Sequence, residues 1–285
     1  MTGVLFACLS GVFFGALNIT MRRALARAGD VDAGSAAIAV VAFVAVAAAA
    51  AVLGLDFDAG ELWPFVLLGA FVPGLSQLLV VHAVRAAGAA RAGILFGMAP
   101  LFSAAIAVVA FGEPLRWPLA LGTLLVVAGG AVLAWEGEHP ADYRAYGAGL
   151  AVAVAAAFGL RDNVARAATE DVVAEPLAQA AALMLGASVV LLANLLRQPA
   201  AFPRLRTAVR PFAASGIVTA LAQVTLFEAL DRARVTIVAP LVGTGVLWTV
   251  VFAAIFLGRS EPVGRRLFVV ALLVVAGGAL VGVTR

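Results

Sequence analysis

Long uninterrupted apolar segments are the feature of this chain that most restricts its fold. Of its 285 residues, 64% are hydrophobic and 12% are charged, whereas soluble domains carry about 25% charged residues. A helix needs about 20 mainly apolar residues to cross a bilayer. Ten such segments are separated by charged or turn-forming stretches: 2–21, 34–55, 62–84, 89–111, 117–135, 146–168, 173–196, 208–230, 235–257 and 266–283. We therefore predict an all-α integral membrane protein with ten transmembrane helices.

The positions of the acidic side chains support these boundaries. Of the 16 acidic residues, only Asp162 and Glu228 fall inside a proposed span. A charge at the centre of a membrane helix costs about 2.5–3.5 kcal/mol on insertion scales, so acids collect in the connections. The Ala- and Leu-rich runs lack the alternation of an outer-membrane barrel. The first run lacks the basic start of a signal peptide, so we expect residues 2–21 to be the first membrane helix.

Composition also excludes several classes of function. The 19 basic residues are all arginines and are spread over the connections, which argues against a nucleic-acid partner. Cys8 is the only cysteine, so no disulfide can form within the chain. There are two histidines and no P-loop, C-x-x-C, H-E-x-x-H or G-x-S-x-G pattern. We predict no metal, no cofactor and no enzymatic activity.

An internal repeat divides the chain into two halves. The letters LLVVAGGA occupy residues 124–131 and recur at 272–279, an offset of 148 (272 − 124), and each copy follows a Glu-Pro pair. The pairs are Glu113-Pro114 and Glu261-Pro262, and both glutamates have the expected position of helix-capping turn residues. Residues 1–138 and 139–285 thus each hold five predicted helices. Because five is odd, the second repeat must be inverted in the bilayer, which is typical of secondary transporters.

Several short segments resemble the EamA-type drug/metabolite transporter superfamily. They are FEALDRARVTIVAPL at 227–241, HAVRAA at 82–87 and APL at 99–101. Two positions depart from the family pattern: the second glutamate is delayed, at Glu261 after Gly258, and Val246 replaces a frequent proline of the ninth helix. The resemblance implies a ten-helix carrier that exports amino acids or other small metabolites. It also implies a central cavity lined mainly by helices 1, 3, 4, 6, 8 and 9.

Polar residues of the predicted first and sixth helices are candidates for this cavity. Phe14 and Asn18 are four residues apart and share a helix face, and Phe158 and Asp162 repeat the arrangement in the second half. Arg161 is the neighbouring charge, deep enough in its span to need a partner or a watery cavity. We predict that these five residues bind substrate. The alternatives are an Asp162–Arg166 ion pair on one helix and an interhelical hydrogen bond from Asn18.

The third, eighth and ninth helices contribute further candidates. Gln77 and Gln223 have equivalent positions in the two repeats and could contact a zwitterionic or polar substrate. Helix-packing hydrogen bonds are the alternative for both amides. Trp248, with Phe96 of the fourth helix, could form an aromatic wall of the cavity; contact with lipid or the core is the alternative.

A proton-coupled carrier needs a group that titrates. Asp162 is one candidate, and His82 and Glu228, which have equivalent positions at the ends of the third and eighth helices, are the others. The alternative for His82 and Glu228 is a purely interfacial position.

The predicted function is secondary transport of a small molecule by alternating access, in a multi-pass protein of the cytoplasmic membrane. Its partners are the lipid bilayer, the substrate and a proton, and the chain is a monomer or a homodimer. A translocase for lipids or lipid-linked precursors has the same fold and is the main alternative; a membrane-embedded transferase is a third. Orientation is open: 13 arginines lie on the side reached after the first helix and six on the other. The positive-inside rule then puts both termini outside, whereas the resemblance implies cytoplasmic termini.

Overall fold

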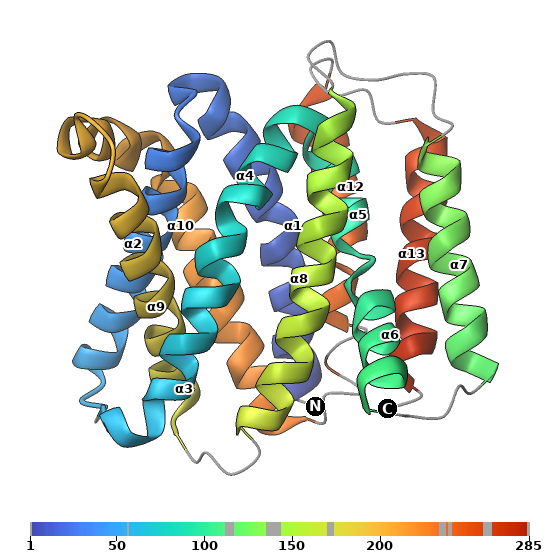
Figure 1. Cartoon of the computed structure of the whole chain (residues 1–285), viewed down its shortest axis with the longest axis horizontal. Coiled ribbons are helices and arrows are strands. Elements are labelled where there is room, and N and C mark those ends of the chain that lie inside the picture. Colours follow the sequence, from blue (N-terminus) through green and yellow to red (C-terminus); the bar gives the residue numbers. More distant parts are fainter. Residues whose placement is uncertain are drawn as a thin grey trace.

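The computed structural model describes residues 2–55, 57–111, 117–134, 144–169, 174–233, 238, 241–258 and 264–283. Every regular element in these ranges is a helix, and the helices pack side by side as one bundle (Figure 1). The start of the first helix and the end of the last lie at the same end of the bundle (Figure 1). The helical part of the prediction is therefore confirmed.

The elements follow the apolar segments of the sequence. They are α1 (Thr2–Ala28), α2 (Val31–Val52), α3 (Ala59–Gly69), the π-helix η1 (Ala70–Leu75), α4 (Ser76–Ala87), α5 (Ala89–Phe96), α6 (Ala99–Phe111), α7 (Trp117–Ala134), α8 (Ala145–Thr169), α9 (Pro176–Leu196), α10 (Ala201–Arg232), α12 (Gly245–Phe256) and α13 (Arg265–Val283).

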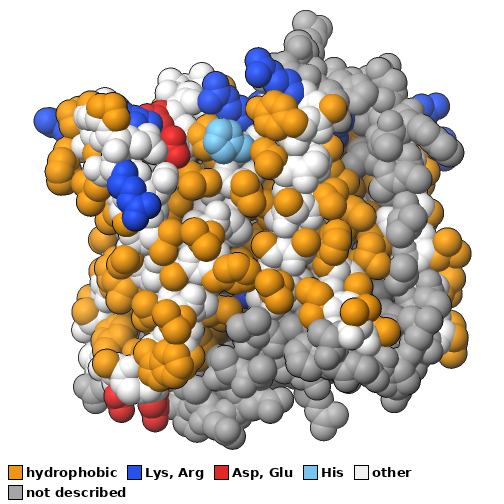
Figure 2. Space-filling view, in the orientation of Figure 1, with side chains coloured by type: hydrophobic (Ala, Val, Ile, Leu, Met, Phe, Trp, Pro, Cys, Tyr) orange, Lys and Arg blue, Asp and Glu red, His pale blue; other side chains and the backbone are white. Residues whose placement is uncertain are grey.

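Five helical stretches of the described chain are long and apolar enough to cross a membrane. They are Thr2–Ala28, Val31–Val52, Ala59–Ala87, Pro176–Leu196 and Ala201–Arg232. Ala145–Arg161 and Leu241–Phe256 are shorter apolar helices. Figure 2 shows hydrophobic side chains over the middle of one face and charged side chains toward its upper and lower edges. Ten crossings and an inverted relation between the repeats stay predictions.

Local chemistry explains where several helices begin and end. The Asp30 side chain accepts a hydrogen bond from the backbone N–H of Ala33 and caps the start of α2. Asp58 caps α3 in the same way through Gly60. Gly88, at φ 88°, separates α4 from α5, a backbone conformation that favours glycine.

Two predicted spans are interrupted. The segment predicted at 62–84 contains α3, η1 and α4, and Val72 has the extended values φ −138° and ψ 113°. Val72 precedes Pro73, and the proline ring disfavours a helical conformation in the residue before it. The segment predicted at 89–111 is divided into α5 and α6 by a turn at Gly97 and Met98. Sequence hydrophobicity is continuous through both breaks, so it gave no sign of them.

Equivalent helices of the two halves of the chain have equivalent neighbours. Helix α1 packs along α10 and α12, and α8, its counterpart in the second half, packs along α4 and α6. Likewise α2 packs on α10, and α9 packs on α3 and η1. Helices α2 and α9 contact each other, as do α7 and α13. The first helix of each half is therefore held mainly by helices of the other half.

Candidate functional site

Asn18 lies where three helices meet. Its side chain is 9% exposed, and its Nδ2 atom donates a hydrogen bond to Thr249 Oγ1 of α12 at 3.1 Å. Thr249 Oγ1 donates in turn to the carbonyl of Gly245 at 2.9 Å. A Cβ atom on Gly93 of α5 would lie 2.7 Å from Thr249 Cγ2. The structure therefore gives Asn18 the interhelical hydrogen bond considered as its alternative role; substrate contact stays a prediction.

Aromatic side chains and one charge gather where α8 meets α5. The ring centroids of Phe158 and Phe96 are 6.2 Å apart. The Arg161 guanidinium carbon lies 5.3 Å from the Phe158 ring centroid, within the range of a cation–π interaction. Arg161 and Phe158 are half-buried. The side chain of Asp162 lies outside the described residues, as does that of Arg166, so their predicted pairing is not described.

Trp248, predicted in the ninth helix, lies in α12 at the surface of the bundle. Trp248 is 38% exposed, and its ring centroid is 5.7 Å from that of Phe252 on the next turn. The Cβ atom of Trp248 lies against α1, because a Cβ added to Gly15 would be 2.6 Å from it. Phe14 is half-buried and packs against the main cluster of buried apolar side chains. The assignment of Phe14 and Trp248 to a substrate cavity stays a prediction.

The two equivalent amides are both buried. Gln77, in the first turn of α4, is 6% exposed, and Gln223 of α10 is 5% exposed. The Nε2 atom of Gln77 has no hydrogen-bond partner among the described residues. A buried donor without a partner costs about 1–3 kcal/mol, because it has lost its water and gained nothing in exchange. An acceptor supplied by a bound substrate would remove this cost.

Among the coupling candidates, Glu228 forms an ion pair with Arg232 one turn further along α10. The Arg232 guanidinium also lies over the Phe6 ring of α1, with its carbon 5.3 Å from the centroid. His82 is half-buried on α4. Glu228 therefore has the charge partner expected of an interfacial residue, and a role of either residue in proton coupling stays a prediction.

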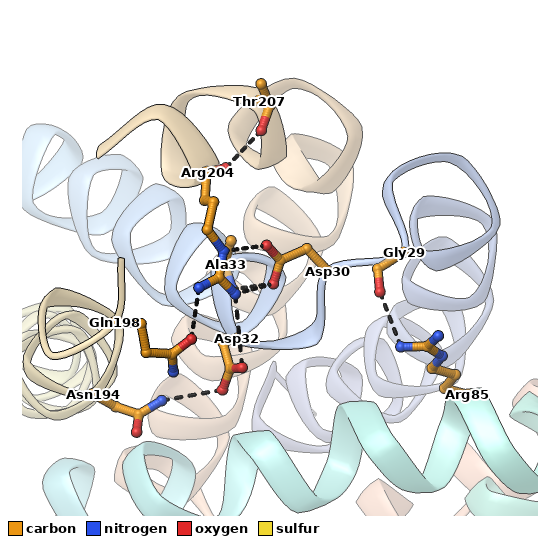
Figure 3. A network of polar contacts seen from close by, with 9 residues as sticks. All are labelled: Gly29, Asp30, Asp32, Ala33, Arg85, Asn194, Gln198, Arg204 and Thr207. Atoms are coloured by element: carbon orange, nitrogen blue, oxygen red, sulfur yellow. Dashed lines mark hydrogen bonds and ion pairs between the residues drawn. The ribbon is translucent and has the colours of Figure 1, made fainter. Parts of the chain in front are cut away.

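One end of the bundle carries a polar network that was not predicted from the sequence, and we call it the rim network (Figure 3). Arg204 of α10 donates hydrogen bonds to both carboxylate oxygens of Asp30, at 2.7 and 2.9 Å, and to Gln198 Oε1 at 2.6 Å. The Oδ2 atom of Asp32 lies 3.8 Å from Arg204 Nη2, and its Oδ1 atom accepts a hydrogen bond from Asn194 of α9 at 3.2 Å. The Arg204 hydrogen bond lowers the pKa of Asp30, and its partial burial opposes this.

Arg85 lies at the same end of the bundle as the rim network and joins neighbouring helices there. Arg85 of α4 donates to the carbonyl of Gly29 at 3.0 Å, and Arg22 of α1 donates to the carbonyl of Arg85 at 2.8 Å. Arg91 of α5 is 3% exposed, and it is one of the 13 arginines that the sequence places on the side reached after the first helix. Burial of this kind depends on the surrounding helices and has no signal in the local sequence.

Within the described ranges no group of three or more His, Cys, Asp or Glu could hold a metal ion.

Comparisons with known proteins agree with this architecture. The profile of the EamA-like transporter family matches residues 1–135 and 145–283. A protein of Methanothermobacter thermautotrophicus (strain Delta H) named "Uncharacterized transporter" is 26% identical over 135 residues, which are 47% of this chain and 39% of that protein. The match thus spans about two fifths of the relative's length. A solved structure named "Crystal structure of protein" has a TM-score of 0.65 at 19% identity, covering 98% of this chain and 96% of that one. This last likeness concerns the fold alone.

Proposed function

Because this chain belongs to the EamA-like transporter family and is a membrane transporter, we propose that it exports a small polar metabolite, such as an amino acid, by alternating access. The protein resides in the cytoplasmic membrane and crosses it ten times as two inverted five-helix repeats. Asn18, Gln77, Gln223 and the α8 residues Arg161 and Asp162 contact the substrate. The aromatic side chains of Phe14, Phe158 and Trp248 form the apolar part of the cavity.

The buried amide of Gln77 carries this proposal. Its Nε2 atom is a hydrogen-bond donor without a partner in the described structure, on a helix that packs against α8. Polar groups in membrane helices that lack partners are costly, so they mark candidate substrate or ion paths. Gln77 also follows the interruption at Val72. Interrupted membrane helices are typical of transporter binding sites.

The matched helix contacts support an inverted repeat. Helix α1 packs on α10, which holds Gln223, and α8 packs on α4, which holds Gln77. The first helix of each half therefore contacts the helix of the other half that holds a buried glutamine. A twofold relation places equivalent residues around one axis, which brings the polar residues of both halves to a shared site. Both termini at one end of the bundle agree with an even number of crossings (Figure 1).

The energy source in this proposal is a proton gradient or the gradient of the metabolite itself. Asp162, Glu228 and His82 are the groups we assign to proton coupling. Of the two whose side chains are described, Glu228 is paired with Arg232. Proton uptake by Glu228 would weaken that pair, so a change in its charge can be transmitted to the end of α10.

Uptake by proteoliposomes tests the proposal. We expect the purified chain to accumulate one class of metabolite from a panel of amino acids and related compounds, with a rate that depends on an imposed pH gradient. A fluorescent phospholipid in the same vesicles, with dithionite added outside, measures lipid translocation. Lipid movement without metabolite uptake would replace the proposal by the translocase alternative.

The Gln77→Leu variant sharpens this test. Removing a buried donor without a partner should leave the stability unchanged or raise it by about 1–3 kcal/mol, while transport falls. The matched control is Gln179→Leu, because Gln179 Nε2 already donates to the carbonyl of Ala174. That variant should lose stability and keep transport. Full transport by Gln77→Leu would remove Gln77 from the binding site.

A further inference from the structure

Helix α10 is longer than a membrane crossing requires. Its 32 residues extend about 48 Å at 1.5 Å per residue, whereas the hydrocarbon core is about 30 Å thick. Pro211 lies inside the helix. The residues from Pro211 to Arg232 extend about 33 Å, which by themselves match one crossing. The first ten residues, 201–210, are therefore surplus to the span; we call them the α10 lead segment.

The α10 lead segment has one face against the bundle. Ala201 and Ala208 are buried, and Leu205 and Val209 pack against the main apolar cluster. This spacing of three or four residues is that of one helix face. Arg204 fixes the segment further through its hydrogen bonds to Asp30 at the start of α2. The segment is thus held to the bundle at the end that carries the rim network (Figure 3).

The opposite face is both apolar and positively charged. Phe202 is 75% exposed, and Arg206 and Arg210, four and eight residues later, are exposed on the same side. Arg197, just before the segment, is exposed as well. These three arginines form no ion pair with a described residue, and the nearby acids Asp30 and Asp32 face Arg204. An exposed aromatic ring gains free energy when it leaves water, and arginines without an acidic partner among the described residues are available to bind anionic groups.

We infer that the α10 lead segment is an interfacial anchor that binds the anionic phospholipids of the surrounding bilayer. The helix leaves the hydrocarbon at Pro211, which puts the preceding turns at the level of the lipid headgroups. Interfacial helices combine aromatic or other apolar side chains, which enter the boundary between headgroups and acyl chains, with arginines that are attracted to anionic headgroups. Phe202 enters the boundary between headgroups and acyl chains, and Arg206 and Arg210 contact lipid phosphates. Each arginine near an anionic surface strengthens binding about fivefold.

An environment-sensitive dye on residue 202 tests the inference. The protein carries Cys8→Ser and Phe202→Cys and is placed in nanodiscs of phosphatidylcholine, alone or with increasing phosphatidylglycerol. We expect a blue shift and protection of the dye from the neutral quencher acrylamide as phosphatidylglycerol rises, with reversal at high salt. A dye on Thr207→Cys, also on the exposed side, repeats the measurement if the first labelled variant does not fold.

Paired arginine variants establish where the lipid binds. The double variant R206Q/R210Q should raise the phosphatidylglycerol fraction at half-maximal shift about fivefold for each arginine removed. The control R265Q/R266Q removes the same charge from two exposed arginines at the start of α13 and should leave that fraction unchanged. Equal emission in both lipids, a dye open to acrylamide in both, or equal losses in the two double variants would each overturn the inference.

Discussion

The crossing of α1 with α12 and the rim network both join distant parts of the chain, but they do so by different physics. At the crossing, Gly15 lets the backbones of α1 and α12 approach closely, and a single buried hydrogen bond connects Asn18 to Thr249. In the rim network, Arg204 and Asp30 form a charged pair whose side chains are 28% and 26% exposed. We infer that close packing holds the helices together inside the bundle, whereas the partly exposed charges of the rim network add a smaller contribution that depends on salt and pH.

The largest loss of stability is expected from a bulky side chain at the contact between α1 and α12. A Cβ on Gly15 would lie 2.9 Å from the Thr249 backbone nitrogen, so Gly15→Leu must separate α1 from α12. Overpacking of this kind costs about 1–3 kcal/mol or more, measured as a lower melting temperature in detergent. The matched control is Gly149→Leu, because a Cβ there meets nothing within 4 Å. Equal losses in both variants would contradict close packing at the crossing.

An intermediate effect is expected from the hydrogen bond at the crossing. A double-mutant cycle of Asn18→Leu and Thr249→Val should give a coupling energy of about 0.6 kcal/mol, the average for polar pairs between membrane helices. Thr225→Val serves as control, since the Thr225 hydroxyl bonds within its own helix, to the carbonyl of Leu221. Coupling between Asn18 and Thr225 as large as that with Thr249 would argue against the observed pairing.

The smallest effect is expected from the rim network, and it should depend on pH. The pKa of Asp30 is lowered from its usual value of 3.8, mainly by the Arg204 hydrogen bond. A lowered pKa in the folded state means that this contribution to stability is present above the usual value and is lost as pH falls through the folded-state pKa. Asp30→Asn should therefore lower the melting temperature slightly at neutral pH and remove this acid-dependent part. Exposed ion pairs are also screened by salt.

Asp58→Asn is the matched control for that prediction. Asp58 caps α3 through Gly60, as Asp30 caps α2 through Ala33, but it forms no ion pair with a described residue. The control variant should keep the acid-dependent loss of stability. Identical melting profiles for both variants would show that capping, and not the contact with Arg204, accounts for the role of Asp30.

The predictions from sequence succeeded where local composition decides the structure. Runs of apolar residues allow only helices in lipid, so the membrane class and the helices were predictable. The family was predictable because its short motifs keep their order along the chain. The breaks at Val72 and Gly97 were missed because hydrophobicity continues through both of them. The candidate site residues Gln77 and Gln223 were predicted from the repeat and are both buried; their contact with a substrate stays a prediction.

Apolar runs in lipid must satisfy their own backbone hydrogen bonds, so the order of apolar and charged residues was enough to predict a helical membrane protein. The short motifs were enough to indicate the transporter family. The contacts between side chains, in contrast, follow from the way the helices pack. Asn18 and Thr249 are 231 residues apart, and Asp30 and Arg204 are 174 apart. Such contacts depend on how helix faces pack against one another, and helical periodicity defines a face without naming its partner.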